Sequence, residues 1–294
     1  MLKKNNFRIS IICISLIVSY FISDIYENIL GFILILSVGV VHGANDLLII
    51  KKYSKKEIKR SEALYFFYYL AIVLLGFVFF YVFPSIALLT FVVVSIYHFG
   101  EQHWEVNLSK SDSDNLNNLF LFISHGIIFF LIIFMNNLKI VNEVLPSFNV
   151  NPLEHRYLVL ALIVFSILYS LFILYFKNLR KYLFNETIFF SLLFLLTINT
   201  TLIFGFAIYF IFFHSLLSIK DQIKFIYDDD NPKNIKKYIR NSMPYFILAL
   251  TFLLICYVVV DLDTINLLPI TFTFLAAITF PHVLVIEKMY RHMK

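Results

Sequence analysis

The sequence is short of charge and of cysteine. Charged residues make up 15% of its 294 residues and hydrophobic residues 60%, whereas soluble domains average about 25% and about 45–50%. This balance excludes an ordinary soluble domain. The two cysteines, Cys13 and Cys256, both fall inside apolar segments. They provide neither a disulfide framework nor a CxxC metal motif.

The apolar segments are continuous, and their length suits a membrane-spanning helix of about 20 residues. They also lack the alternation that strands of a membrane barrel show. We predict an all-α, polytopic transmembrane helix bundle of about ten spans, with eight or nine also open, forming a single integral-membrane domain over residues 1–294. The expected spans are residues 8–23, 29–50, 64–83, 85–105, 118–136, 157–176, 187–200, 202–219, 243–260 and 267–287.

Two of these segments have more than one interpretation. Residues 187–219 contain almost no loop, which fits a re-entrant hairpin or one long broken helix. The first segment has a charged start but no small-residue cleavage site before Ser23. We therefore expect a retained helix there rather than a signal peptide.

Basic residues are concentrated in alternate loops. With ten spans, the lysines and arginines of both termini and of the loops near residues 51–60, 177–181 and 220–240 all fall on one side. The positive-inside rule makes that side cytoplasmic. We expect a multi-pass protein of the inner (plasma) membrane with both termini in the cytoplasm. This topology explains the net charge of +5, so we expect no nucleic-acid partner. The apolar spans make the lipid bilayer the expected partner.

Four histidines interrupt four apolar segments at a similar expected depth. They lie roughly 5–8 residues before the cytoplasmic helix ends, which corresponds to about 8–12 Å at 1.5 Å per residue. An imidazole in hydrocarbon is costly without a partner, and a shared transition-metal ion is the simplest partner for several. A hydrogen bond from each ring to a carbonyl or a serine is the alternative. The four candidate metal ligands are His42, His98, His214 and His282.

Polar residues accompany the candidate ligands. Asp46 follows His42 by four residues, and Asp221 lies two turns after His214, so each carboxylate is expected on the face of its histidine. Such carboxylates orient metal-bound imidazoles, although capping of helix ends explains them equally well. Glu101 and Gln102 are candidates for the same supporting role.

The remaining histidines are weaker candidates. His125 enters the fifth span from the cytoplasmic side at a comparable depth and is a reserve ligand. His103, His155 and His292 are expected near the membrane surfaces and exposed to solvent, with His103 kept as a further reserve.

Four ordered segments around these histidines resemble one enzyme family. VHGANDLL is similar to the PHGALD-type motif of the Brp/Blh family of membrane β-carotene 15,15′-dioxygenases. YHFGEQHW resembles its HFG motif, FFHSLLSIKDQ its WHSLRH-type motif, and FPHVLVIE a late PH motif. The resemblance runs from the second expected span to the last. It implies Fe²⁺-dependent, O₂-consuming cleavage of the central double bond of β-carotene, or a related carotenoid, to retinal. It also implies a possible functional link to a retinal-binding rhodopsin.

In one position the sequence departs from that family. The resemblance assigns iron to His42, His98 and His214, but the second histidine of the third motif is replaced by Ser218. A hydroxyl is a poor iron ligand. Either another histidine (His282, His103 or His125) completes the site, or three ligands suffice, or the chemistry has changed. Depth and helix direction favour His282.

Other functions remain as alternatives. Intramembrane His and Asp residues also build proton relays and transporters, but the sequence shows no convincing inverted repeat. Another His-ligated membrane oxidase is possible, although the HxxHH boxes of desaturases are absent. Haem held between two histidines is the third alternative, and a Soret absorption band would identify it.

Overall fold

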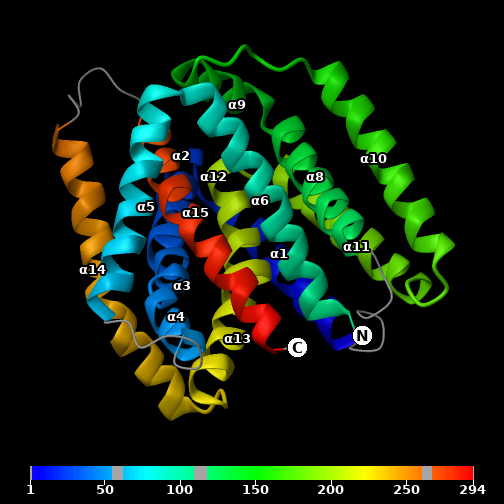
Figure 1. Ribbon diagram of the computed structural model, residues 1–294. Helices are drawn as coiled ribbons and strands as arrows, with labels where there is room; N and C mark the ends of the chain where they lie inside the picture. The colour runs from blue at the N-terminus through cyan, green and yellow to red at the C-terminus, as the bar shows by residue number, and fades with distance from the viewer. Residues whose placement is uncertain (1, 55–61, 109–117, 260–266, 294) are drawn as a thin grey trace. The chain divides into compact units, whose positions relative to one another are not determined.

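The computed structural model describes residues 2–54, 62–108, 118–259 and 267–293, and all regular structure in these ranges is helical (Figure 1). This confirms the predicted all-α class. Nine helical segments in the described residues are long and apolar enough to cross a membrane, namely Asp24–Ser54, Ala63–Val82, Pro84–Glu105, Asn118–Asn136, His155–Tyr175, Arg180–Ile198, Leu202–Tyr227, Pro232–Val258 and Leu268–Met293.

The predicted segments overlap these helices, and several helices run further than expected, such as Pro232–Val258 where residues 243–260 were expected. The first expected span lies in a helix whose apolar part, Asn6–Phe21, is shorter than the nine others. The segment expected at residues 187–200 begins at Arg180 instead, because the polar residues before it continue the helix. A break at residues 199–201 separates it from the next helix, so this region is two helices rather than one long broken helix.

The chain divides into two compact units. Unit 1 comprises Met1–Ile35, Ser95–Pro146 and Asn151–His214, and unit 2 comprises Leu36–Val94, Ser147–Val150 and Ser215–Lys294. The expectation that residues 1–294 form a single domain remains a prediction. The helices of unit 1, including those shared at its borders, are α1 (Leu2–Phe21), α2 (Asp24–Leu34), α6 (Pro84–Asn107), α8 (Asn118–Asn136), α9 (Leu138–Val144), η2 (Leu145–Phe148), α10 (His155–Tyr175), α11 (Arg180–Ile198), α12 (Leu202–Tyr209) and η3 (Phe210–Ser215).

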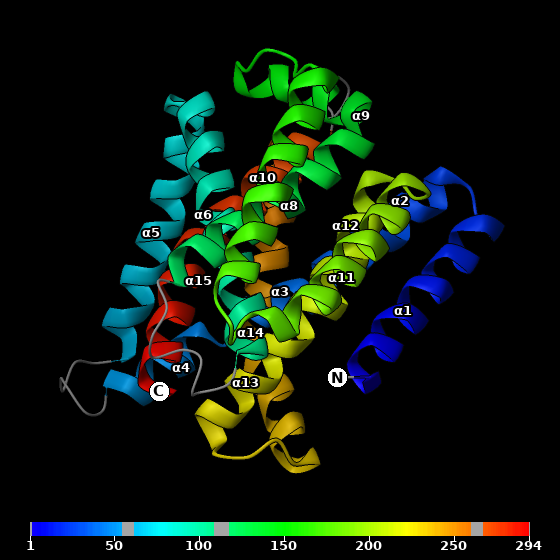
Figure 2. The same ribbon diagram turned by 90° about the vertical axis from the view of Figure 1, so that its right-hand side faces the viewer.

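Within unit 1, α8 packs against both α10 and α11, and α2 packs along α12 (Figure 1 and Figure 2). Its core is largely aromatic and includes Phe99, Phe129, Phe189 and Tyr209. On α10 several apolar side chains outside this core are exposed, among them Leu160, Ile163 and Leu171. In a membrane protein such exposed apolar faces are the surfaces that contact lipid.

Two glycines bring α6 and α8 into backbone contact. A Cβ added at Gly100 would lie 1.8 Å from the carbonyl oxygen of Phe122, and one at Gly126 would lie 2.0 Å from that of Ile96. Small residues at helix interfaces permit this close approach in membranes. The contact sets the positions of the polar residues that α6 and α8 carry.

Unit 2 is built around α15. This helix packs along α5 and also contacts α4 (Figure 2). Pro281 lies inside α15 and Pro244 inside α14. The elements of unit 2, besides the first part of α6, are η1 (Ile35–Gly39), α3 (Val40–Gly43), α4 (Asp46–Ser54), α5 (Glu62–Val82), α13 (Leu216–Tyr227), α14 (Pro232–Val259) and α15 (Leu267–Met293).

Candidate metal centre

Two of the motif histidines occur where the helix widens to a π-helix. His214 lies within η3, and His42 follows η1 by three residues in the short helix α3. A π-helical turn redirects side chains and leaves backbone carbonyls to be satisfied from elsewhere, and such turns are frequent at functional sites. The local backbone thus departs from a regular α-helix at His214 and in the turn just before the helix that carries His42.

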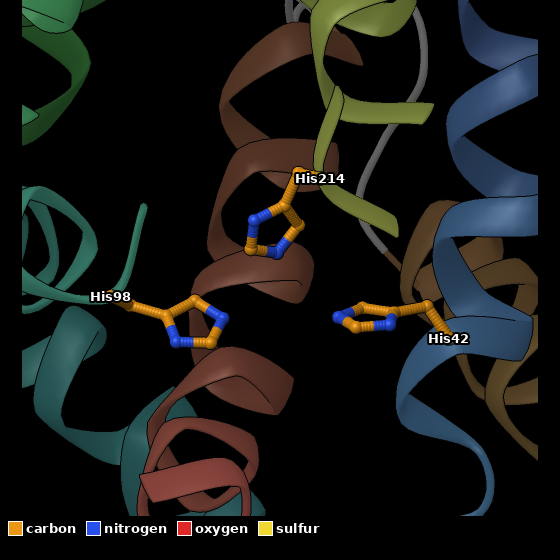
Figure 3. A group of neighbouring side chains, drawn as sticks. All are labelled: His42, His98 and His214. Carbon is orange, nitrogen blue, oxygen red and sulfur yellow. The ribbon is translucent and has the colours of Figure 1, made fainter. Parts of the chain in front are cut away.

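In unit 1 the structure brings His98 and His214 together. Their ring centroids are 4.9 Å apart with the planes at 77° (Figure 3). Both imidazoles are buried. The ring of Phe99 packs against His214 at 4.6 Å, and the amide nitrogen of Gln102 donates to the backbone carbonyl of His214 at 2.7 Å. The second and third motifs therefore form one packed arrangement. His42, also drawn in Figure 3, belongs to unit 2.

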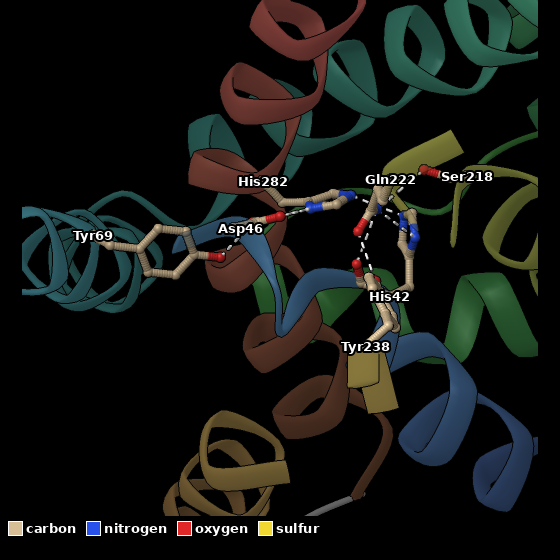
Figure 4. Close-up of polar contacts among 7 residues, drawn as sticks. All are labelled: His42, Asp46, Tyr69, Ser218, Gln222, Tyr238 and His282. Atoms are coloured by element: carbon tan, nitrogen blue, oxygen red, sulfur yellow. Dashed lines mark hydrogen bonds and ion pairs between the residues drawn. The ribbon is translucent and has the colours of Figure 1, made fainter. Parts of the chain in front are cut away.

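In unit 2 the structure brings His42 and His282 together (Figure 4). Their Nε2 atoms lie 2.9 Å apart. The Nδ1 atom of His282 is 2.9 and 3.0 Å from the two carboxylate oxygens of Asp46, and the Tyr69 hydroxyl donates to Asp46 at 2.9 Å. Since a carboxylate only accepts, Nδ1 of His282 carries the proton and its Nε2 keeps a lone pair. That lone pair faces His42.

Gln222 positions the other imidazole of this pair. Its amide nitrogen lies 3.2 Å from Nδ1 of His42, 3.1 Å from the His42 carbonyl oxygen and 3.2 Å from the Ser218 hydroxyl (Figure 4). The Tyr238 hydroxyl donates to the Gln222 side-chain oxygen at 2.7 Å. Ser218, which the sequence offered as a supporting or reserve residue, therefore contacts Gln222.

The supporting carboxylates differ from expectation. Asp46 was expected on the face of His42, but the chain turns at residues 44–45 and Asp46 begins the new helix α4. The turn directs its carboxylate to His282 instead. Asp221 accepts a hydrogen bond from the Tyr290 hydroxyl at 3.3 Å. Glu101, on α6, accepts one from the Tyr97 hydroxyl at 2.8 Å.

His103 is buried and not exposed to solvent. The prediction was wrong because α6 continues to Asn107 and His103 is covered by neighbouring helices of unit 1. Its Nε2 lies 2.8 Å from a carboxylate oxygen of Glu186, and its ring stacks on that of His125 at 3.8 Å. His155 and His292 are exposed as predicted. Sequence reasoning missed Glu186, since the expected span began one residue after it.

A cavity of about 240 Å³ in unit 2 borders the His282 hydrogen bonds. It is lined by residues of α4, α5 and α15, including Tyr65, Tyr69 and Pro281. The ring of Tyr69 thus lines the cavity while its hydroxyl contacts Asp46. Sites for small organic ligands usually measure about 300–1,000 Å³, so this cavity suits only one end of a large apolar molecule.

The donor atoms suit a transition metal. His42, His98, His214 and His282 are each 6% exposed or less, and imidazole nitrogen binds iron, copper and zinc well. The carboxylate of Asp46 on the outer nitrogen of His282 is the arrangement that commonly orients metal-bound histidines. The residues present therefore fit a metal ion, while imidazole donors alone do not select one of these elements.

Comparison with known proteins agrees with this chemistry. No curated protein and no solved structure matches the chain. A family model described as "Beta-carotene 15,15'-dioxygenase" matches residues 33–290. This range covers most of the sequence and contains all four motif histidines. Enzymes of this family cleave β-carotene centrally to retinal, which requires O₂. The chain belongs to the β-carotene 15,15′-dioxygenase family.

Proposed function

We propose that His42, His98, His214 and His282 bind a single Fe²⁺ ion, and that this site cleaves β-carotene, or a closely related carotenoid, at its central double bond. The observation that carries the proposal is the pairing of buried motif histidines within each unit. His98 contacts His214 in unit 1, and His42 contacts His282 in unit 2.

The geometry within unit 2 supports His282 as a ligand. Two neighbouring ligand nitrogens about 2.0–2.1 Å from an octahedral ion stand about 2.9 Å apart, and the Nε2 atoms of His42 and His282 are separated by 2.9 Å. The family's usual second histidine of the third motif is replaced here by Ser218. We infer that His282 supplies the missing imidazole, while Ser218 contacts the Gln222 amide that orients His42.

Bound iron would supply the oxidative chemistry toward O₂, as metal cofactors do in general. The protein's own contribution is orientation and exclusion of water. Asp46 and Gln222 hold the two imidazoles of unit 2, and the rings of Phe99 and Phe210 cover His214 at 4.6 and 5.4 Å. An apolar polyene reaches such a site from the bilayer. If it binds in one fixed position along the site, a single double bond lies at the metal.

We also infer the cellular setting of the reaction. If α1 crosses the membrane in addition to the nine longer segments, the distribution of basic loops supports both termini in the cytoplasm and the protein in the inner membrane. The product is an apolar aldehyde that stays in the bilayer. A membrane protein that binds retinal as a Schiff base, such as a rhodopsin, is the class of partner that would consume it.

Expression in cells that accumulate β-carotene tests the activity. We expect aerobic cultures to lose yellow colour and to gain retinal, measured by chromatography of membrane extracts, and anaerobic cultures to keep their carotene. His155→Ala, which changes an exposed histidine, serves as the matched control and should behave as the unmodified chain. Unchanged carotene in aerobic cells with abundant folded protein would refute carotene cleavage.

Asp46→Asn tests the orientation of His282. Asparagine keeps the size of the side chain, but its amide can present either an accepting oxygen or a donating nitrogen to Nδ1 of His282. The tautomer of His282 is therefore no longer fixed. We expect metal affinity to fall about 10–100-fold, the usual effect of losing such a partner, as measured by titration with a competing chelator. Asp221→Asn is the matched control, because Asp221 contacts Tyr290. Equal affinity in the two variants would argue against His282 as a ligand.

A further inference from the structure

Unit 1 contains a second buried group of metal-type ligands. It consists of His103 on α6, His125 on α8 and Glu186 on α11, all buried, and their donor atoms lie within 4.8 Å of one another. The Glu186 carboxylate reaches both rings, with one oxygen 2.8 Å from Nε2 of His103 and the other 3.3 Å from Nδ1 of His125. None of these residues is a motif histidine.

Hydrogen bonding explains only part of this cluster. The Tyr169 hydroxyl donates to Glu186 at 2.8 Å, and His103 contacts the same carboxylate. His125 is fully buried, and its Nδ1 contacts Glu186 at 3.3 Å without the geometry of a hydrogen bond, while its Nε2 makes no hydrogen bond to any residue the structure describes. A buried imidazole with unsatisfied nitrogens is costly and calls for an explanation.

The contact between His125 and Glu186 has the spacing of two ligands rather than of a hydrogen bond. Ligand atoms about 2.0–2.1 Å from a tetrahedral ion stand about 3.3–3.4 Å apart, and Nδ1 of His125 lies 3.3 Å from the Glu186 oxygen. Two imidazoles and one carboxylate also form a donor set that binds zinc in proteins.

We propose that His103, His125 and Glu186 bind a second divalent transition-metal ion, of the zinc type, which links α6, α8 and α11 within unit 1. Tyr169 positions the carboxylate through its hydroxyl. The competing explanation is an ion-pair network without metal. Arg8 would then provide the positive charge. Its guanidinium lies 4.7 Å from the centre of the Phe189 ring, and Phe189 follows Glu186 by about one turn of α11, so Arg8 lies near the carboxylate.

Metal counting on the purified full-length chain tests the proposal. Protein stripped of metal is reloaded with Zn²⁺, and bound zinc is measured by mass spectrometry after removal of free ion. We expect two ions per chain in the unmodified protein, one in Glu186→Gln and one in His98→Ala. Glu154→Gln, which changes an exposed glutamate, is the matched control and should keep two. Equal zinc content in the unmodified protein and Glu186→Gln would overturn the second site.

Substitution with Co²⁺ distinguishes the two proposed metal sites even if one of them does not bind metal. A tetrahedral Co²⁺ site absorbs visible light, and we expect Glu186→Gln to lose a band that His98→Ala retains. If Glu186→Gln does not fold, Tyr169→Phe replaces it, because that variant keeps the ring and removes only the hydroxyl. We expect Tyr169→Phe to weaken the second ion about 10–100-fold. An unchanged cobalt titration in Tyr169→Phe would count against the proposal, whatever the result for carotene cleavage.

Discussion

His98→Ala and His214→Ala are each expected to abolish retinal formation and to remove the catalytic metal. These imidazoles are buried and packed against one another in unit 1, and the Phe99 and Phe210 rings beside His214 carry no donor atom that could replace a lost imidazole. Loss of an outer partner of a metal ligand costs about 10–100-fold in affinity, and loss of the ligand itself should exceed this. Retinal production falls to background in the carotene-accumulating cells, and iron per chain falls in the purified variants.

The control for this result is again His155→Ala, because that histidine is exposed at the start of α10. His42→Ala should match the two unit 1 variants if all three histidines hold the same ion. Glu186→Gln should keep its iron, because the cluster around it is separate from the motif histidines. Full metal content in the His42, His98 and His214 variants would contradict the assigned ligand set.

The sequence predicted the helical class and most of the spans, because these depend on hydropathy. It also selected four histidines that the structure buries, and their role as ligands stays a prediction. It did not predict the partner of Asp46. Spacing by four residues places two side chains on one face only in a continuous helix, and the chain turns at residues 44–45 between His42 and Asp46. A two-residue turn inside an apolar segment leaves no clear compositional signal.

The second cluster was missed for a different reason. Its three ligands come from α6, α8 and α11, which are far apart in the sequence, so no local spacing connects them. His103 seemed to lie at a surface because it follows His98 by five residues near an expected helix end. Glu186 fell one residue outside an expected span. Burial of both residues depends on packing between helices, which hydropathy along one segment does not report.

Gly100→Ala is expected to lower the melting temperature markedly. The new methyl carbon would lie 1.8 Å from the carbonyl oxygen and 2.5 Å from the carbonyl carbon of Phe122, and a backbone cannot rotate away as a side chain can. Overpacking costs about 1–3 kcal/mol, occasionally more, which corresponds to a fall of about 2–12 °C at about 2–4 °C per kcal/mol. Thermal unfolding of the purified protein measures it.

Gly43→Ala is the matched control, because a Cβ at Gly43 meets no atom closer than Nδ1 of His282 at 3.7 Å. Alanine is favoured over glycine inside helices by about 0.5–1 kcal/mol, so this variant should keep or raise the melting temperature. Equal melting temperatures for the two variants would show that α6 and α8 are not in backbone contact at Gly100.

The paired glycine Gly126 allows a stronger test of the same contact. A Cβ there would lie 2.0 Å from the Ile96 carbonyl oxygen, so each added methyl forces the same two helices apart. Once the first methyl has separated them, the second meets less resistance. The double variant should therefore lose less stability than the sum of the two single losses, as expected for residues that share one contact. Separation should also disrupt the stacked rings of His103 and His125, which lie 3.8 Å apart on these helices. If the two losses simply add, the glycines act at independent contacts and the close crossing of α6 and α8 is not what positions these histidines.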